Sequence, residues 1–559
     1  MKFAELQRYT SALYAGPGTS VGDYIMGERF LHEVEDEIPA YIRRLRVAFL
    51  SSFTIQGLAE VLKAHGVFHN LLIDAYTAPY NQFTQEILSD ASRLYGFDPQ
   101  LIYLMIDRKD IFDVQHLQEL LSRLEERTRA KIIVFNFVAG QEYPMDKIDA
   151  EGKLLEDGYR DHPRVSIFDF DSFLRGIGKE DYWYTKYREL GDLRLAPSAF
   201  PMLAEILAGY AVASLGAAKK CAVFDLDNTL WQGIVGEDGI ERLQPNQTLQ
   251  KHAVELYRRG VILAIASRNN LEDAMDAIDQ HPDMILRRDH FAAWRINWDP
   301  KDRNLYALAE ELNIGTDSMV FIDDDPFQQN LIRASLPEVA VVPPDRFHEY
   351  SGFHAFVVTE EDTRRGAMYG EDRKRKEFQQ SFNDAEEYIQ GLNIEIIVQE
   401  ARPESISRIS QLTQKTNQFN VTTRRYSEEE ITAQINQGKK VWSIRVRDIF
   451  GDYGITGTCI VEPGQEAWKI DTFLLSCRVM GRAVEKAFLG YVIDQIRGAG
   501  VTRLIGEYIP TKKNQPCASF FPDAGFTSVC TRDDNVTIYE FDLTREFQKP
   551  DFINITQEE

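Results

Sequence analysis

Residues 221–233, CAVFDLDNTLWQG, begin as a continuous apolar run and end in a loop that carries two aspartates, Asp225 and Asp227. A short apolar run bounded by polar residues is typical of a strand buried in a parallel sheet. In open sheets of this kind, ligands bind at the carboxyl ends of the strands, close to helix N-termini that favour anions. Because the two carboxylates are two positions apart, they can converge on one metal ion or one phosphoryl group. For this motif alone, a solvated strand end without function is the alternative.

Three further segments each place a polar side chain at the end of an apolar run or in the loop before a helix. They are GVILAIASRNN (260–270) with Ser267, WDPKDRN (298–304) with Lys301, and SMVFIDDD (318–325) with Asp323 and Asp324. With Asp225 and Asp227 they meet the requirements of phosphoryl transfer: a carboxylate nucleophile, a second carboxylate as acid and base, donors for the phosphoryl oxygens, and carboxylates for Mg²⁺. The four motifs in this order indicate phosphoryl transfer much more specifically than any single motif does.

This ordered set resembles the haloacid-dehalogenase (HAD) superfamily of phosphatases, whose four motifs correspond to DLDNT (225–229), Ser267, Lys301 and FIDDD (321–325). The resemblance implies that Asp225 is the nucleophile, which forms an aspartyl-phosphate, and that Asp227 is the general acid and base. It implies phosphate binding by Thr229, Ser267 and Lys301. The implied Mg²⁺ ligands are Asp225, Asp227, Asp323 and Asp324, and the choice between Asp323 and Asp324 stays open.

The intervals between these motifs limit what can cover the site. Residues 228–266 and 268–300 each have room for one helix-and-strand unit, so neither interval holds a large cap domain. We therefore expect a site open enough for a bulky or protein-tethered substrate, or one that a neighbouring domain closes. A short flap, WQGIVGEDGIERL (231–243), can still cover a small ligand.

Apolar runs and helical patterns divide the 559 residues into three regions. Between about residues 40 and 175, and again from residue 221, apolar runs alternate with helical patterns, which predicts βαβ units and parallel sheets. A charged segment over 361–391 is expected to be a solvent-bridging helix, and an α+β unit follows it. The predicted boundaries are 1–195 for the first domain, 196–218 for a connecting helix, 219–350 for the HAD-like domain, 351–391 for linker helices, 392–548 for the third domain and 549–559 for a tail.

The net charge limits the partners of the chain. Lys and Arg number 63 against 87 Asp and Glu, which gives a formal charge of −24. Such a charge repels phosphate backbones and anionic lipid surfaces, so we expect no binding to nucleic acid or membranes. The five cysteines are widely spaced without a CxxC pair, which indicates neither a disulfide framework nor a zinc site. Since no signal-peptide core and no membrane span are found, a cytoplasmic protein is predicted.

Residues 474–485, LLSCRVMGRAVE, contain an R-x-x-G-x-A turn directly before a helical pattern. Such a turn can present backbone N–H groups to a pyrophosphate or a pantetheine arm, although a helix start packed through small residues explains it equally well. Further on, PTKKNQP (510–516) and FFPDAGF (520–526) resemble the end of GCN5-related N-acetyltransferase (GNAT) folds. The residues predicted to bind a carrier or its pantetheine arm are Arg478, Gly481, Arg482, Ala483 and Asn514.

Three stretches in combination narrow the resemblance: DLDNTLWQGIVGEDG (225–239), TQKTNQFNVTTRRYS (413–427) and LLSCRVMGRAVE. They resemble the FkbH-like family, HAD subfamily IIIC proteins that serve polyketide assembly, over roughly residues 219–545. The resemblance implies a Mg²⁺-dependent bifunctional glyceryl transferase/phosphatase. Such an enzyme dephosphorylates 1,3-bisphosphoglycerate and loads the glyceryl group as a thioester onto a phosphopantetheinylated acyl carrier protein, for methoxymalonyl-type extender units or three-carbon starters.

Thioester chemistry requires a thiol. Cys477 lies at a predicted strand-to-helix junction beside Arg478 and Arg482, where N–H groups and positive charge favour the thiolate. Three interpretations are compatible with the sequence: an acyl-carrying nucleophile at Cys477, a buried structural cysteine there, or direct transfer to the thiol of the carrier. Cys517 is a weaker rival, and the remaining candidates, Cys221 and Cys459, are expected in the core.

The block NQFNVTTRRY (417–426) allows two interpretations. It is either a polar loop or a loop that faces the substrate or the carrier. In the second case, Asn417, Asn420, Thr423 and Arg424 offer hydrogen-bond donors to hydroxyl or phosphate groups.

The first region places Ser51 and Ser52 after an apolar strand, and Asn136 at the end of a later one. This layout resembles SGNH-hydrolase folds but departs from them in two respects. Ser51 stands where an Asp usually precedes the nucleophile, and no Asp-x-x-His follows Asn136: DVQH (113–116) comes too early and His162 lacks the spacing. We therefore expect a docking or structural domain without catalysis.

The predicted fold is a multi-domain α/β chain with an SGNH-like parallel sheet, a cap-less HAD domain of Rossmann type and a GNAT-like α+β domain. Three functions are weighed for it. The leading one is glyceryl transfer with phosphatase activity. The second is a plain Mg²⁺-dependent phosphatase of a small metabolite, whose GNAT-like domain only binds. The third is a non-catalytic docking scaffold for a carrier protein, against which the complete HAD motif set argues.

Overall fold

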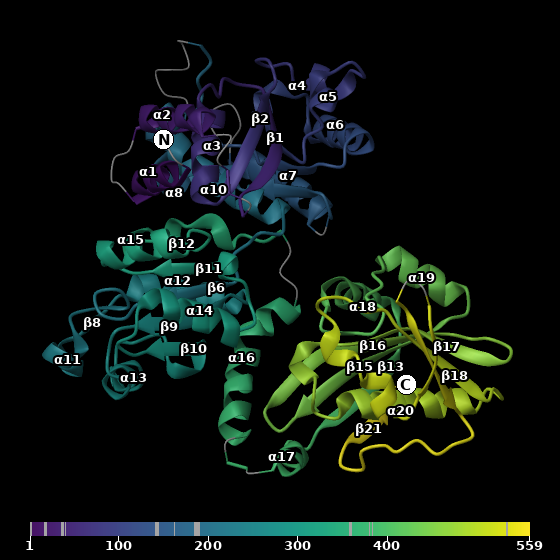
Figure 1. Ribbon diagram of the computed structural model, residues 1–559. Coiled ribbons are helices and arrows are strands. Elements are labelled where there is room, and N and C mark those ends of the chain that lie inside the picture. The colour runs from purple at the N-terminus through teal and green to yellow at the C-terminus, as the bar shows by residue number, and fades with distance from the viewer. Residues whose placement is uncertain are drawn as a thin grey trace. The chain divides into compact units, whose positions relative to one another are not determined.

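The computed structural model divides the chain into two compact units, residues 1–367 and 368–559 (Figure 1). The described residues are 3–15, 20–34, 38–39, 41–139, 145–160, 162–183, 191–356, 360–379, 381–382, 384–532 and 535–558. Among them, no helix combines the length and the apolar character needed to cross a membrane. Each unit has its own hydrophobic core.

The first unit begins with a five-stranded parallel sheet in the order β2-β1-β3-β4-β5. Its strands are β1 (Arg43–Ser51), β2 (Leu71–Thr77), β3 (Leu101–Met105), β4 (Lys131–Phe135) and β5 (Val165–Phe168). Alternate residues of a strand face opposite sides of a sheet. Phe49 therefore packs with α3 (Leu58–Phe68) and α10 (Phe200–Ser214), whereas Leu50 packs with α6 (Val114–Arg127). Helices thus cover both faces, as apolar parallel strands require.

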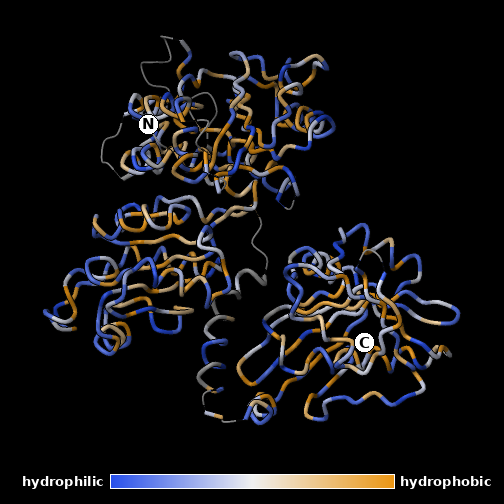
Figure 2. Tube along the Cα trace, viewed as in Figure 1, coloured by the Kyte–Doolittle hydropathy of each residue, from blue (hydrophilic) through white to orange (hydrophobic). Residues whose placement is uncertain are grey.

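A second five-stranded parallel sheet follows in the order β10-β9-β6-β11-β12. Its strands are β6 (Cys221–Phe224), β9 (Ile262–Ser267), β10 (Phe291–Ile296), β11 (Met319–Ile322) and β12 (Ala340–Val342). The main helices are α12 (Gln247–Arg258), α13 (Leu271–Gln280), α14 (Lys301–Glu311) and α15 (Pro326–Ser335). Figure 2 shows the hydrophobic residues concentrated along the strands. Because β6 lies between β9 and β11, the chain after CAVF leaves the sheet at the middle of its carboxyl edge.

A buried ionic cluster links the helices of the two sheets. Glu205 on α10 lies 3.1 Å from His65 Nδ1 and 3.0 Å from His69 Nε2, and the backbone N–H of Ser351 donates to it at 2.8 Å. Burial alone raises the pKa of Glu205, but His69 and His65 outweigh it and hold that pKa well below its usual range. The segment expected to be a connecting helix therefore forms α10, a central part of the first unit.

Replacing Glu205 tests this cluster. We expect Glu205→Gln to lower the stability of the first unit by about 3 kcal/mol, because the amide has one oxygen and cannot accept all the hydrogen bonds that the two carboxylate oxygens make with His65, His69 and Ser351. Since the pKa of Glu205 is depressed in the folded state, its contribution is complete at neutral pH and is lost only as the pH falls below its usual value of 4.5. Thermal unfolding at neutral pH measures the effect, with Glu241→Gln, at an exposed position, as control. Equal melting temperatures for both variants would contradict the prediction.

The second unit is built on a mixed sheet in the order β19-β20-β18-β17-β16-β15-β13-β21, with β14 pairing with β17 off this path. The strands are β13 (Glu395–Glu400), β14 (Phe419–Asn420), β15 (Lys440–Asp448), β16 (Gly451–Glu462), β17 (Ala467–Leu475), β18 (Arg503–Tyr508), β19 (Thr527–Thr531), β20 (Thr537–Asp542) and β21 (Asn554–Gln557). The helices include α18 (Pro403–Lys415), α19 (Glu428–Asn436) and α20 (Val484–Arg497). The predicted multi-domain α/β class, with two parallel sheets and one mixed sheet, is confirmed.

The helix α16 (Glu360–Gln379) is more than the solvent-bridging element that its charges predicted. Arg375 is 1% exposed, and its Nε lies 2.6 Å from a carboxylate oxygen of Asp448. Its guanidinium also lies 4.1 Å from the ring centre of Tyr453. A buried arginine that pairs with a carboxylate does not register as part of an apolar stripe, which is why the sequence pattern concealed this contact.

Candidate active site

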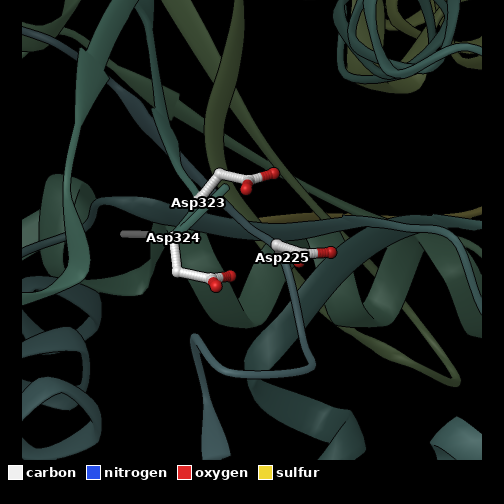
Figure 3. Close-up of side chains that lie close together, drawn as sticks. All are labelled: Asp225, Asp323 and Asp324. Carbon is white, nitrogen blue, oxygen red and sulfur yellow. The ribbon is translucent and has the colours of Figure 1, made fainter. Parts of the chain in front are cut away.

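Three carboxylates meet at the carboxyl edge of the second sheet. Asp225 directly follows β6, and its backbone N–H donates to the carbonyl of Ile322 on β11 at 2.9 Å. Asp323 and Asp324 directly follow β11. One oxygen from each of the three side chains lies within 4.8 Å of the others, and Figure 3 shows the three close together. The strand ends that the sequence indicated therefore converge.

The electrostatics of this acidic group fit a divalent cation. Burial, followed by the charge of Asp225, raises the pKa of Asp323 and also that of Asp324. Both shifts mean that the ionised carboxylates are held in an unfavourable arrangement. A cation that takes oxygen ligands, as Mg²⁺ does, would relieve it. The residues present thus fit a Mg²⁺ site.

Lys301 is the cation within this group. It is the first residue of α14 and is 3% exposed, and its Nζ lies 2.8 Å from Asp225 Oδ1 and 2.6 Å from Asp323 Oδ2. Burial lowers the pKa of Lys301, but Asp225 and Asp323 outweigh it and raise that pKa above its usual value. The amine is therefore protonated. Because Asp323 is fully buried against Lys301 whereas Asp324 is exposed, Asp324 is the more accessible to a hydrated ion.

Thr229 contacts the loop that carries Asp324. Its side chain is 0% exposed, its hydroxyl donates to Asp324 Oδ1 at 3.2 Å, and it accepts the backbone N–H of Asp324 at 3.1 Å. Thr229 therefore positions Asp324, and its role in phosphate binding stays a prediction.

Asp227 lies apart from the three convergent carboxylates. Its Oδ1 accepts hydrogen bonds from Trp231 Nε1 at 2.9 Å and from the backbone N–H of Val235 at 3.1 Å. Its Oδ2 accepts one from Asn269 Nδ2 at 3.0 Å. Both side-chain oxygens are engaged by donors and lie outside the convergent group, and a role of Asp227 in holding Mg²⁺ stays a prediction. A carboxylate held beside the acidic group but outside it suits proton transfer.

Two side chains of this site were not singled out by the sequence, Trp231 and Asn269. Besides its bond to Asp227, the Asn269 amide lies 3.3 Å from the hydroxyl of Ser267, which ends β9 and is 1% exposed. Asn269 thus bridges Asp227 and Ser267. The only available signal was proximity, because Trp231 and Asn269 each lie within four residues of a motif residue.

A short hairpin stands beside Asp227. The strands β7 (Trp231–Gln232) and β8 (Gln244–Pro245) pair antiparallel around α11 (Val235–Asp238). Residues 219–350 are all described and contain no inserted cap domain. Since Trp231 and Val235 of the hairpin both donate to Asp227, a movement of this flap would change the surroundings of that carboxylate.

In the second unit, the block 417–426 contains a short strand, β14, at Phe419–Asn420, and residues 421–426 follow it outside any strand. The strands β17 and β18 pair only over 467–470 and 503–506. Beyond that point the segment 419–421 lies between them: β14 pairs with the end of β17, and the N–H of Ile509 donates to the carbonyl of Val421 at 2.9 Å.

The two asparagines predicted to bind ligands hold this inserted strand. Asn420 and Asn514 are both 0% exposed, and Asn514 Nδ2 donates to the carbonyl of Asn420 at 3.0 Å. Asn420 Oδ1 accepts the N–H of Thr423 at 2.8 Å, and Asn514 Oδ1 accepts that of Thr511 at 2.7 Å. Full burial makes both amides structural, so their predicted binding roles are corrected.

The other polar residues of the block are also engaged internally. Arg424 donates to Asp471 Oδ1 at 3.0 Å and to Glu507 Oε2 at 2.8 Å. Asn417 Oδ1 accepts a hydrogen bond from Arg425 at 2.6 Å. Thr423 has a left-handed φ of 51° and belongs to the turn that Asn420 stabilises. Asp471 and Glu507 also pair with Lys439, Lys469 and Arg532, and the Arg424 side chain is 30% exposed, so the expectation that Arg424 offers donors to a ligand stays a prediction.

The R-x-x-G-x-A segment forms the turn before α20. Gly481 and Ala483 have left-handed φ values of 73° and 60°. Arg482 contacts the hydroxyl of Tyr453, and its guanidinium lies 5.5 Å from the centre of that ring. Arg478 Nε donates to Ser476 Oγ at 3.3 Å. The geometry supports the interpretation as a helix start and leaves Gly481 exposed.

The cysteines considered as nucleophiles differ in their burial and in the pKa of their thiols. The backbone of Cys477 begins a 3₁₀ turn, and its side chain lies outside the described part of the structure. Cys221 and Cys459 are buried, and burial raises the pKa of both thiols. Burial also raises the pKa of Cys517 to about 11, which makes it a poor nucleophile at neutral pH.

The serines of the first sheet have structural partners. Ser51 Oγ donates to the carbonyl of Phe53 at 2.8 Å, and Ser52 Oγ accepts the N–H of Asp107 at 3.0 Å. Asn136 Nδ2 donates to Asp169 Oδ1 at 2.8 Å. Within residues 41–139 and 145–183 no histidine contacts either serine. This part of the chain shows no hydrolase triad.

Comparison with models of protein families and with curated proteins gives no match. Among solved structures, the chain is similar to the N-terminal part of the protein BF1531 from Bacteroides fragilis, which contains a phosphatase domain complexed with Mg. The two are 24% identical with a TM-score of 0.50, over 64% of this chain and 99% of that one. At this identity the likeness shows that they share a fold.

Weaker similarity links part of the chain to acetyltransferase structures. The ribosomal-protein-S18-alanine N-acetyltransferase from Escherichia coli is 11% identical over 26% of this chain and 94% of its own, with a TM-score of 0.22. An acetyltransferase from Thermus thermophilus is 14% identical over 27% and 99%, with a TM-score of 0.22. Because these scores are low, the description of the second unit rests on its own strand order.

Proposed function

We propose that the first unit is a Mg²⁺-dependent phosphatase of the HAD type with Asp225 as its nucleophile. The observation that carries this proposal is the convergence of Asp225, Asp323 and Asp324 beside the buried ammonium of Lys301. The Mg complex of the phosphatase domain in BF1531, which has the same fold, supports it. In the proposed site, Asp225 and Asp324 would hold Mg²⁺, which offsets the charge of the phosphoryl oxygens when bound.

The residues of the chain supply the remaining chemistry. Asp225 attacks phosphorus, a new P–O bond forms, and the bond to the substrate oxygen breaks while that oxygen takes a proton from Asp227. Water then attacks the aspartyl-phosphate, Asp227 accepts its proton, and inorganic phosphate leaves with Asp225 restored. In this proposal Lys301 and Ser267 donate to the phosphoryl oxygens.

We further propose that this phosphatase serves glyceryl transfer onto a phosphopantetheinylated acyl carrier protein, with 1,3-bisphosphoglycerate as substrate. The support is the resemblance of residues 219–545 to the FkbH-like family. In the acyl half-reaction a thiolate attacks the C1 carbonyl and displaces inorganic phosphate, and Asp225 removes the phosphate at C3. Cys221, Cys459 and Cys517 are buried, and the proposed acyl acceptor is Cys477 or the carrier thiol itself, with the exposed Cys530 as the other accessible cysteine to be tested.

One experiment separates the functions. The full-length protein is incubated with 1,3-bisphosphoglycerate, Mg²⁺ and a phosphopantetheinylated carrier protein, and both proteins are weighed by intact mass spectrometry. A glyceryl adduct on the carrier supports glyceryl transfer. Phosphate release without an adduct supports the plain phosphatase, and the absence of both would leave a non-catalytic scaffold.

Cys477→Ala tests the site of any enzyme-bound acyl group. We expect it to remove a glyceryl adduct on the protein itself, because the variant lacks the accepting thiol. Cys530→Ala is the matched control, since Cys530 is exposed and lies in β19. Intact mass after incubation without the carrier gives the answer. An adduct that persists in Cys477→Ala would place the thiol elsewhere.

Asn269→Ala tests the bridge between Asp227 and Ser267. We expect kcat for phosphate release to fall about tenfold with little change in KM, because one hydrogen bond that orients the proton-transfer group is lost. Asn270→Ala is the control, since the neighbouring Asn270 is exposed and pairs with Asp273. A change confined to KM would instead assign Asn269 to substrate binding.

A further inference from the structure

A cavity of about 660 Å³ in the first unit is lined by residues of α1 (Phe3–Ala15), α15 and β12. Figure 1 shows where these three elements lie in the chain. The volume is in the range of small-molecule sites. The described lining residues include Arg8, Arg333, the rings of Tyr41 and Phe68, and no acidic residue. Of these residues, Arg333 is the one that indicates a ligand.

Arg333 has only neutral partners among the described residues. Its guanidinium lies 3.4 Å from Asn330 Oδ1, 3.3 Å from Gln329 Oε1 and 3.4 Å from the carbonyl of Val341. Its Nε is buried without a partner. Burial lowers the pKa of Arg333. The buried Arg375, in contrast, pairs with Asp448.

A bound anion would stabilise the guanidinium of Arg333. Arg333 is half-buried, and the partial burial of a charge without a counter-charge costs free energy, which a bound carboxylate or phosphate would offset. The planar fork of arginine also matches these groups in geometry. The aromatic rings of the cavity can contact the apolar part of a ligand.

A second feature connects the cavity to the acidic group. Gln329, which is 8% exposed, accepts from Arg333 and donates through Nε2 to the carbonyl of Asp323 at 2.7 Å. The same helix, α15, begins directly after Asp325. Two hydrogen bonds therefore join Arg333 to the loop that carries Asp323 and Asp324.

We propose that this cavity binds a small anionic metabolite through Arg333, by a phosphate or a carboxylate group, and that its occupancy changes the Mg²⁺ affinity of the acidic group through Gln329. The site lies at the far end of α15 from the acidic group and is distinct from it. Anion binding stands independently of the proposed phosphatase activity, whereas the link to Mg²⁺ rests on that proposal.

The first test measures binding to the full-length protein in EDTA, with inorganic phosphate and succinate as separate probes. Titration calorimetry gives the affinity and hydrogen exchange gives the location. We expect protection in α1, α15 and β12, and an affinity that falls about tenfold or more in Arg333→Gln, with a smaller loss in Arg333→Lys. Arg123→Gln, an exposed position on α6, should bind as the wild type does.

The probes also separate the two anion chemistries. Binding of phosphate alone indicates a phosphate ester, and binding of succinate alone a carboxylate. The proposal is overturned if neither probe binds, or if Arg333→Gln binds like the wild type. It is equally overturned if protection appears only around Ser267 and Lys301, since the probe then occupies the phosphoryl site.

The second test measures Mg²⁺ affinity by calorimetry with and without the probe that binds. We expect a change of about fivefold in the wild type, none in Arg333→Gln, and none in Gln329→Leu although the probe still binds. The same change in Gln329→Leu would overturn the link. A wild-type protein that binds the anion but no Mg²⁺ would refute the proposed phosphatase and leave the anion site standing.

Discussion

Asp225→Asn should reduce phosphate release from the C3 position of 1,3-bisphosphoglycerate by about a thousandfold or more, because an amide cannot form the aspartyl-phosphate. The same loss is expected with a small aryl phosphate, which tests the phosphatase without the acyl chemistry. A colorimetric assay of inorganic phosphate after acyl transfer is complete provides the measurement.

The fold should survive this substitution. Lys301 keeps its contact with Asp323 at 2.6 Å, and the variant removes one of three mutually repelling carboxylates. We therefore expect the melting temperature in EDTA to stay level or to rise. A loss of activity together with a lower melting temperature would indicate unfolding and would not identify the nucleophile.

Asp227→Asn is the matched variant. It keeps the nucleophile and removes the proton-transfer group, so hydrolysis of the covalent intermediate should slow and one phosphoryl group should be found on the protein by intact mass. The adduct should be absent in Asp225→Asn. Undiminished phosphate release by Asp225→Asn would move the nucleophile to another residue.

The sequence was sufficient to predict the acidic group because every member follows an apolar run directly. Cys221–Phe224 and Met319–Ile322 are short, apolar and bounded by polar residues, which identifies buried parallel strands. Parallel strands end at one edge of the sheet, so Asp225, Asp323 and Asp324 had to come close. The absence of a large cap domain followed from the short intervals between the motifs, residues 228–266 and 268–300.

What each side chain does within the site could not be predicted in this way. Asp225 and Asp227 are two positions apart, yet only Asp225 joins the acidic group, because the partners of Asp227 come from the flap and from the loop after β9. The resemblance to HAD phosphatases implied that Thr229 binds phosphate. Its hydroxyl contacts Asp324, which lies 95 positions further along the chain.

In the second unit, the roles of single side chains were even harder to predict from local sequence patterns. The block 417–426 is polar, and polar residues without periodicity predict a surface loop. Its residues 419–422 are buried because β17 and β18 diverge and leave a gap that residues 419–421 fill. The amide that holds Asn420 there belongs to Asn514, 94 positions away. No local pattern reveals such a partner, so buried structural asparagines looked like ligand-binding ones.

The second prediction with a large effect concerns the stability that Lys301 gives to the acidic group. We expect Lys301→Met to destabilise the first unit in EDTA by about 4 kcal/mol, because methionine keeps an apolar side chain of similar length and leaves Asp225 and Asp323 without their cation. Adding Mg²⁺ should restore much of this loss, since a ligand that binds only the folded state stabilises it by an amount that grows with the logarithm of the ligand concentration relative to its Kd.

Thermal unfolding with EDTA and with Mg²⁺ measures both effects. Lys301→Arg keeps the charge and should melt close to the wild type, whereas Lys251→Met, at an exposed position on α12, controls for the loss of a surface lysine. If Lys301→Met melts like the wild type in EDTA, the carboxylates do not depend on the ammonium. If it is destabilised but Mg²⁺ does not restore it, the acidic group does not bind the ion, and the proposed phosphatase loses its metal. Because the first comparison concerns the ion pair and the second concerns the metal, the two conclusions can be drawn from one set of melting curves.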